Sequence, residues 1–182
     1  MEHVVVPLDP DHVAAVAALT ADAAAAMGRG APARSQPHVT LVAYTGPGRA
    51  AAREALADVA AEVAPFVLRA HGYGVFARTG HSGLSLHVPV VRDRQLDQLH
   101  ARVVAALTAA GAEVAGWSQP DLWSPHVTLL DRDLTATDVG AGVAALASRH
   151  HPSWHVPVDR LQLRGGWADP AEDDAEVRFS RS

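Results

Sequence analysis

The chain has 182 residues, no cysteine and a formal net charge of −5, and all 15 of its basic residues are arginine. The absence of cysteine excludes disulfides and thiolate nucleophiles, and the absence of lysine excludes a P-loop, a Schiff base and a lysine-bound AMP intermediate. The negative net charge argues against binding along an extended nucleic-acid duplex, because such binding neutralises many phosphates with basic side chains.

Strands and helices are predicted to alternate along the chain from the apolar periodicity and the glycine and proline breaks. In chain order, the pattern predicts a strand at 3–8, a helix at 11–27, a strand at 38–44, a helix at 49–63, strands at 66–76 and 83–91, a helix at 93–110, a strand at 126–131, a helix at 137–149, and strands at 154–164 and 176–180. His100 falls within the third helix, where we expect a surface or boundary position. The fold class is therefore α+β (α/β).

The length is that of one domain with its own core, so we expect a single domain over residues 1–182. No basic segment followed by an apolar one begins the sequence, and the apolar runs are too short for a membrane span. We therefore expect a cytoplasmic protein with no membrane contact.

The pentapeptide Pro-His-Val-Thr-Leu occurs twice, at 37–41 and at 125–129, about half the chain length apart. Side chains alternate along a strand, so His and Thr share one face while Val and Leu face the core. A single His-x-Thr on a strand is usually a structural feature. Two identical copies on matching elements favour a shared functional site.

Two such pairs supply what a phosphodiester reaction needs. Histidine titrates near neutrality, so one ring can act as general base while the other acts as general acid. The threonine hydroxyls can donate hydrogen bonds to the oxygens that gain charge in the transition state. We therefore expect four catalytic residues: His38, Thr40, His126 and Thr128. The near-symmetric motifs leave open which histidine is the acid.

The two motifs in two similar halves resemble the 2H phosphoesterase superfamily, in its 2′-5′ RNA ligase-like (LigT-like) branch. The resemblance implies a duplicated fold of two lobes, with antiparallel-rich sheets facing a central cleft and helices outside. It also implies metal-independent chemistry on 2′,3′-cyclic phosphates, carried by the His and Thr of both motifs. No cofactor and no metal site are expected.

Four further residues are candidates for binding substrate. Arg34 precedes the first motif and Arg132 follows the second, so either can hold phosphate or be a solvated surface arginine. Tyr44 and Trp123 are candidates for stacking a base, with core packing as the alternative for Trp123. Ser35 stands where the second half has Trp123, so we expect the base on the second-half side.

The function that follows is hydrolysis of a 2′,3′-cyclic phosphate on a nucleotide or an RNA end. Two alternatives remain: 2′-5′ RNA ligase activity by the same acid-base pair, or a module that binds a nucleotide or RNA end without turnover. The expected partner in each case is a nucleotide or RNA terminus. The sequence does not choose an oligomeric state.

Overall fold

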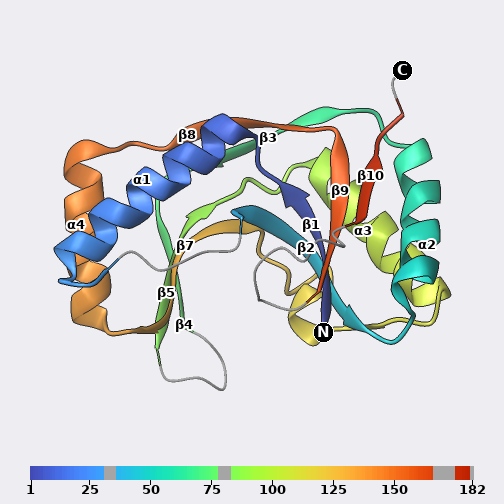
Figure 1. Ribbon diagram of the computed structural model, residues 1–182, viewed down its shortest axis with the longest axis horizontal. Helices are drawn as coiled ribbons and strands as arrows, with labels where there is room; N and C mark the ends of the chain where they lie inside the picture. The colour runs from blue at the N-terminus through green and yellow to red at the C-terminus, as the bar shows by residue number, and fades with distance from the viewer. Residues whose placement is uncertain (31–35, 78–82, 166–174, 181–182) are drawn as a thin grey trace.

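The computed structural model describes residues 1–30, 36–77, 83–165 and 175–180 (Figure 1). These residues form four α-helices and ten strands, joined by turns and loops. The helices are α1 (Pro10–Ala26), α2 (Arg49–Ala61), α3 (Arg94–Ala109) and α4 (Ala136–Arg149), with a short 3₁₀ helix η1 (Gly116–Ser118). The strands are β1 (Glu2–Pro7), β2 (His38–Thr45), β3 (Phe66–His71), β4 (Gly74–Ala77), β5 (Leu84–Pro89), β6 (Glu113–Val114), β7 (His126–Leu134), β8 (Ser153–Val158), β9 (Arg160–Gly165) and β10 (Ala175–Arg178).

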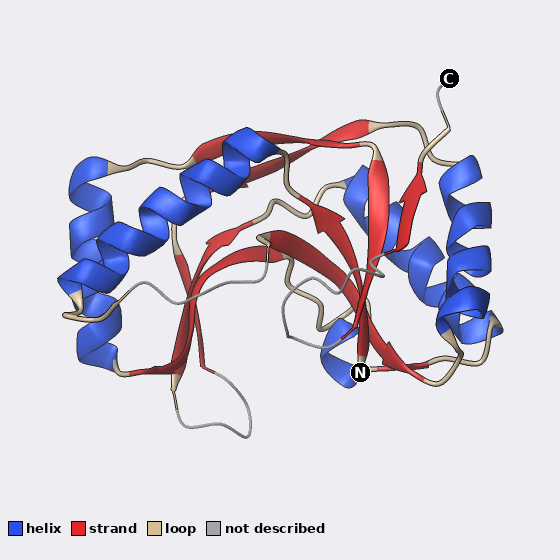
Figure 2. Cartoon of the chain, in the orientation of Figure 1, coloured by secondary structure: helices blue, strands red, loops and turns tan. Residues whose placement is uncertain are grey.

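Eight of these strands form one antiparallel sheet in the order β10-β9-β1-β2-β7-β5-β4, with β6 added alongside β2. The other two, β3 and β8, form a separate antiparallel ribbon that runs along one side of the molecule between the two pairs of helices (Figure 2). The two motif strands, β2 and β7, are therefore neighbours at the centre of the sheet.

The sheet and its helices repeat the same plan on both sides of this centre. The order β1-α1-β2-α2-β3-β4 in the first half matches β5-α3-β7-α4-β8-β9 in the second. Outward from β2 lie β1 and β9, and outward from β7 lie β5 and β4. Helix α1 packs with α4 and over β7, whereas α2 packs with α3 beside the β2 side (Figure 1). Each helix pair thus takes one helix from each half, and the predicted α+β class is confirmed.

Local sequence accounts for where the helices begin. The Asp9 side chain accepts hydrogen bonds from the backbone N–H groups of Asp11 and His12 at the start of α1. Thr135 and Asp138 form a capping box at the start of α4. Such side chains satisfy N–H groups that have no partner within the helix.

Two strands predicted as continuous are each divided in the structure. The run at 66–76 separates into β3 and β4 because Gly72 adopts φ 72°, and the two pieces pair with different strands. The run at 154–164 separates at Asp159 into β8, which pairs with β3, and β9, which pairs with β1. Both breaks let the chain leave the ribbon and enter the main sheet.

No helix among the described residues is long and apolar enough to cross a membrane.

Candidate active site

The two pentapeptides meet at the centre of the sheet, where Val39 of β2 pairs with Val127 of β7. In this antiparallel register, the histidine of each motif lies across from the threonine of the other. The valine and leucine of both motifs are fully buried in the core, as the alternation predicted. The face of the sheet that carries the other four side chains is called the motif face: His38, Thr40, His126 and Thr128.

Both motif histidines are held by the same local bond. His38 Nδ1 lies 2.9 Å from the carbonyl oxygen of Gln36, and His126 Nδ1 lies 2.8 Å from that of Ser124. In each case the carbonyl belongs to the residue two positions earlier, on the far side of a proline. When Nδ1–H donates to this carbonyl, Nε2 is the nitrogen left to exchange a proton with a substrate.

The surroundings of both rings favour the neutral imidazole. Burial lowers the pKa of His38 to about 4. The bond to the Gln36 carbonyl acts to raise this pKa, whereas the positive charge of Arg164 acts to lower it. Burial also lowers the pKa of His126, while the bond to Ser124 and the negative charge of Asp131 act in the opposite direction. The two rings thus differ in the charges that face them.

Two aromatic rings form a wall beside His126. His87 of β5 pairs with Thr128 and is buried, and its ring stacks on Phe76 of β4 at a centroid distance of 4.0 Å. Phe76 meets His126 edge-on at 4.8 Å and 73°, and His87 lies 5.0 Å from the same ring. Burial lowers the pKa of His87 to about 4, so this ring is neutral near pH 7 and packs against the site as an aromatic group.

Gly74 makes this wall possible, because a Cβ at position 74 would collide with the His87 ring. We expect Gly74→Ala to displace His87 and Phe76 and to lower kcat/KM by about 10- to 100-fold through misplacement of His126. Gly140 lies within α4 with open space around it, so Gly140→Ala is the matched control and should stabilise the protein by about 0.5–1 kcal/mol. Kinetics and thermal unfolding of both variants test this, and full activity in Gly74→Ala would contradict it.

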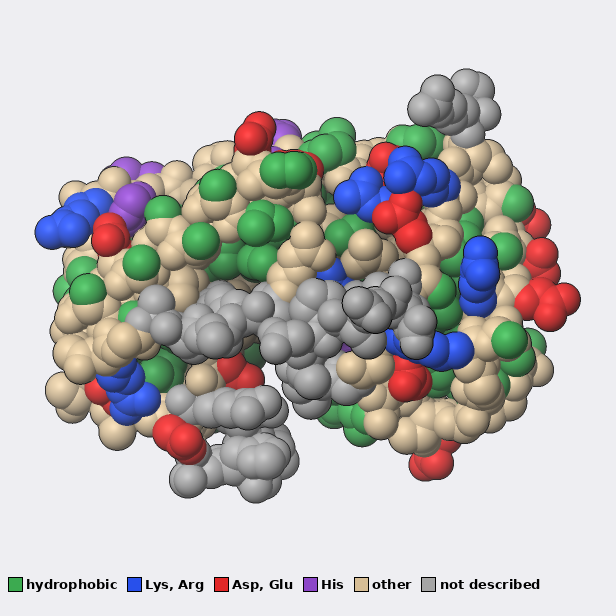
Figure 3. Space-filling view, in the orientation of Figure 1, with side chains coloured by type: hydrophobic (Ala, Val, Ile, Leu, Met, Phe, Trp, Pro, Cys, Tyr) green, Lys and Arg blue, Asp and Glu red, His purple; other side chains and the backbone are tan. Residues whose placement is uncertain are grey.

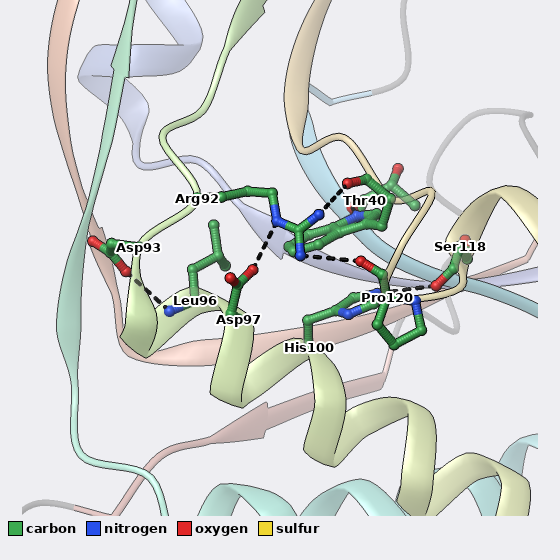
Figure 4. Close-up of polar contacts among 9 residues, drawn as sticks. Thr40, Arg92, Asp93, Leu96, Asp97, His100, Ser118 and Pro120 are labelled. Atoms are coloured by element: carbon green, nitrogen blue, oxygen red, sulfur yellow. Dashed lines mark hydrogen bonds and ion pairs between the residues drawn. The ribbon is translucent and has the colours of Figure 1, made fainter.

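Trp123 ties the loop before the second motif to the first motif, and Arg92 and His100 bond this segment at Pro120 and Ser118 (Figure 4). Trp123 Nε1 donates to the Thr40 carbonyl oxygen at 3.0 Å. Its ring stacks on His100 of α3 at 3.9 Å and 5°, and the Arg92 guanidinium carbon lies 5.5 Å from its centroid. Arg92 also donates to the carbonyl oxygens of Trp123 and Pro120, so α3 and its start hold this loop against β2.

These contacts correct two expectations about base stacking and one about His100. Trp123 is 3% exposed and is covered by His100 and Arg92, so its ring serves core packing, the alternative named for it. Tyr44 is 1% exposed within the core, and burial raises the pKa of its hydroxyl to about 12. His100 is buried rather than at a boundary, because it packs under Trp123 and bonds the Ser118 carbonyl at 3.0 Å.

Both arginines that were expected to bind phosphate fall outside what the structure describes, which omits all of Arg34 and the side chain of Arg132. Both remain predictions. The structure instead brings Arg164, His87 and Phe76 to the motif face, and sequence reasoning missed all three. Val-Pro ends both β1 and β5, and in each strand the proline pairs with a motif histidine; this weak repeat was the signal available for His87.

The described residues contain no cluster of three or more His, Cys, Asp or Glu side chains arranged to hold a metal ion. The arrangement on the motif face is instead one of two imidazoles and two hydroxyls. It offers proton transfer and hydrogen-bond donation to a substrate oxygen.

Comparisons with solved structures agree with this fold. The chain is similar to TT0787 of Thermus thermophilus (18% identity, TM-score 0.58, covering 98% of this chain and 94% of that one). It is also similar to a protein described as a phosphoesterase (15%, 0.57, 100% and 95%) and to E. coli LigT complexed with 3′-AMP (15%, 0.55, 98% and 94%). The comparison with curated proteins gives no match.

The fold is thus the one shared by E. coli LigT and the protein described as a phosphoesterase. Residues 8–165 match the family described as the 2′-5′ RNA ligase superfamily, and the chain belongs to that superfamily. Membership gives it a phosphoesterase or RNA ligase-like function.

Proposed function

We propose that the protein is a metal-independent cyclic phosphodiesterase that opens the 2′,3′-cyclic phosphate of a nucleotide or an RNA end. The observation that carries this proposal is the pairing of Val39 with Val127, which sets the histidine of each motif beside the threonine of the other. Acid, base and two hydroxyl donors then share one face of the sheet. A binding module has no need for both proton-transfer groups.

The reaction proceeds by in-line attack of water on phosphorus. One neutral imidazole takes a proton from the water as its oxygen bonds to phosphorus. The bond from phosphorus to one ribose oxygen breaks, and that oxygen receives a proton from the other, protonated imidazole. Thr40 and Thr128 donate hydrogen bonds to the non-bridging oxygens, which gain charge in the transition state.

A nucleotide ligand is supported by the relatives with this fold. LigT of E. coli has been crystallised with 3′-AMP and with NADP⁺, and the LigT structure with NADP⁺ matches this chain at 16% identity and a TM-score of 0.54. A small ligand also suits the charge distribution of the surface. On the face in Figure 3, basic and acidic side chains of the described residues lie in small mixed groups rather than along one basic track.

A substrate panel tests the proposal. Wild-type protein is incubated with the four 2′,3′-cyclic mononucleotides and a short RNA ending in a cyclic phosphate, with EDTA present, and products are followed by HPLC and ³¹P NMR. We expect ring opening that EDTA does not reduce, and the phosphorus shift identifies the ribose oxygen that leaves. Strong loss of turnover with EDTA would contradict the metal-independent mechanism.

The same panel separates the alternatives. Thermal stabilisation by a cyclic nucleotide without any product would replace the enzyme proposal with a binding module. Joining of an RNA 5′-hydroxyl end to the cyclic phosphate would indicate ligation, which uses the same two histidines with the ribose hydroxyl in place of water. Ring opening without joining supports the hydrolase.

A further inference from the structure

An open pocket of about 380 Å³ lies where the ribbon of β3 and β8 meets the main sheet, at the end of β1 and the start of β9 (Figure 1). Phe66 forms one of its walls, and Phe179 backs this ring in a parallel arrangement at 6.4 Å and 7°. We call it the corner pocket. Its apolar walls include Pro7, Phe66 and Pro157, and its charged side chains are Asp9, Asp159 and Arg160.

The corner pocket adjoins the motif face through β1 and β9. Pro7 pairs with His38, so their two side chains share one face of the sheet. Val5, two residues before Pro7 on that face, pairs with Gln162 of β9. Arg160 lies two residues before Gln162 and therefore carries its side chain on the same face. The pocket thus begins beside His38 and extends two strand spacings away, at about 4.8 Å each.

Two charged side chains of the pocket are fixed against each other. Arg160 Nη1 donates to Asp159 Oδ1 at 2.8 Å, and Arg160 Nε lies 3.2 Å from Glu176 Oε2. Among the contacts of the described residues, none uses Arg160 Nη2 or Asp159 Oδ2. The pocket is therefore lined by one N–H donor group and one acceptor oxygen that are held in place and open to a ligand.

This lining favours a nucleoside as the occupant. Two carboxylates and one guanidinium give the pocket a net negative charge, which disfavours a phosphate group inside it. Both oxygens of Asp9 are engaged at the start of α1, by backbone N–H groups and by His12, so Asp159 and Arg160 are left for the ligand. A base packs flat against apolar and aromatic walls, and its edge and the ribose hydroxyls both donate and accept hydrogen bonds.

The shape of a cyclic nucleotide directs its 5′ side to this pocket. The ring phosphate joins O2′ and O3′, so the base on C1′ and the 5′-oxygen beyond C4′ leave the sugar in opposite directions. Phe76 and His87 offer an aromatic wall to the base on the β4 and β5 side of the motifs. With the base on that side, the 5′-oxygen points across β1 to the corner pocket.

We propose that the corner pocket binds the nucleoside that precedes the cyclic phosphate end, so that the substrate is an RNA end of at least two nucleotides. This inference rests on the proposed function. The phosphate that links the two nucleosides crosses Pro7, outside the carboxylate-lined part of the pocket. The preceding base packs against Phe66 and Pro157, and Asp159 and Arg160 bond its edge or its ribose hydroxyls.

Kinetics on three substrates test the proposal in the wild-type protein. They are adenosine 2′,3′-cyclic phosphate, the same nucleotide with a 5′-phosphate, and the dinucleotide ApA that ends in the cyclic phosphate. We expect kcat/KM for the dinucleotide to exceed that for the mononucleotide by about 10-fold or more, the usual worth of one stacked base. The 5′-phosphate alone should give little of this gain. Equal values for the dinucleotide and the mononucleotide would overturn the proposal.

Filling the pocket should remove the preference for the dinucleotide. Pro157 is exposed on β8, and in Pro157→Trp an indole takes the place of the preceding base. The ratio of the two kcat/KM values should then fall by about 10-fold. His155→Trp is the matched control, because it adds the same ring on the same face of β8 outside the pocket, and it should keep the ratio. A folded Pro157→Trp with the wild-type ratio would contradict the proposal.

Arg160→Gln tests the polar side of the pocket. It should lower the same ratio, whereas Arg178→Gln should keep it, because Arg178 bonds the same Glu176 carboxylate without lining the pocket. An equal loss on the mononucleotide and the dinucleotide in Arg160→Gln would indicate that the pocket holds the terminal base, and would overturn the assignment.

Binding separates this inference from the proposed function. Isothermal titration calorimetry compares 3′-AMP with ApA bearing a 3′-phosphate, and neither ligand requires turnover. Affinity for the dinucleotide that is about 10-fold higher, and that is lost in Pro157→Trp, would support the pocket even if the substrate panel showed no ring opening. Ring opening of the mononucleotide together with equal affinity for the two ligands would keep the proposed function and remove the pocket.

Discussion

His38→Ala and His126→Ala should each lower kcat on a 2′,3′-cyclic nucleotide by about 10²–10⁴-fold, the usual worth of one positioned proton-transfer group. Each ring is held by a bond to a carbonyl two residues earlier, with Arg164 Nη1 also 3.0 Å from His38 Nδ1, and neither ring belongs to the apolar core. The fold should therefore survive both changes. Steady-state kinetics together with thermal unfolding measure the two effects separately.

A histidine away from the site provides the control. His155 is exposed on β8, in the ribbon with β3, and His155→Ala should keep wild-type kcat. The double variant His38→Ala/His126→Ala should lose little beyond the worse single variant, because groups that act as a unit are not additive. Retained turnover in either single variant would remove the two-histidine mechanism.

The centre of the site was predictable because its pattern is local and repeated. The alternation within each pentapeptide placed its valine and leucine in the core, and the burial of Val39 and Val127 confirms this. The predicted helices agree with α1 to α4 to within a few residues at their ends. The periodicity of apolar residues, and the glycines and prolines that end it, indicate helices and strands within a short window of sequence.

Features that depend on distant contacts were not predictable. Nothing in the sequence near Trp123 shows that its indole reaches the Thr40 carbonyl, since the partner lies in the other half of the chain. The same is true of Arg164, which meets His38 only because β9 pairs with β1. Amphipathic residues such as tryptophan and tyrosine serve core and binding surfaces alike, so residue type alone did not separate the two uses.

The two strand breaks were not predicted, for a related reason. An apolar run such as 66–76 has the composition of one strand, and the alternation continues across Gly72. The division into β3 and β4 follows from their different partners, β8 and β5, which no local window contains. Strand composition reports a half-buried surface and leaves open which neighbour covers it.

Trp123→Ala should cost about 3–5 kcal/mol in the free energy of unfolding, the usual range for removing a buried aromatic side chain. The indole is enclosed by His100 and Arg92, and its loss leaves a cavity between α3 and β2. It also removes the donor to the Thr40 carbonyl, within the first motif. Urea unfolding measures the change, and we expect a fall in kcat alongside it because Thr40 loses its support.

Two further variants separate the packing of the Trp123 ring from its hydrogen bond to Thr40 and provide a control. Trp123→Phe keeps an aromatic ring against His100 but cannot donate to Thr40, so it should cost about 1–3 kcal/mol, the cost of leaving a buried polar group unpaired. Trp117→Ala removes a tryptophan that is 45% exposed in η1, ahead of the same loop, and should stay within about 0.5 kcal/mol of wild type. A Trp123→Ala protein no less stable than Trp117→Ala would mean that the loop does not depend on this anchor. If kcat fell in Trp123→Ala but not in Trp123→Phe, packing rather than the bond to Thr40 would be what holds the first motif in place.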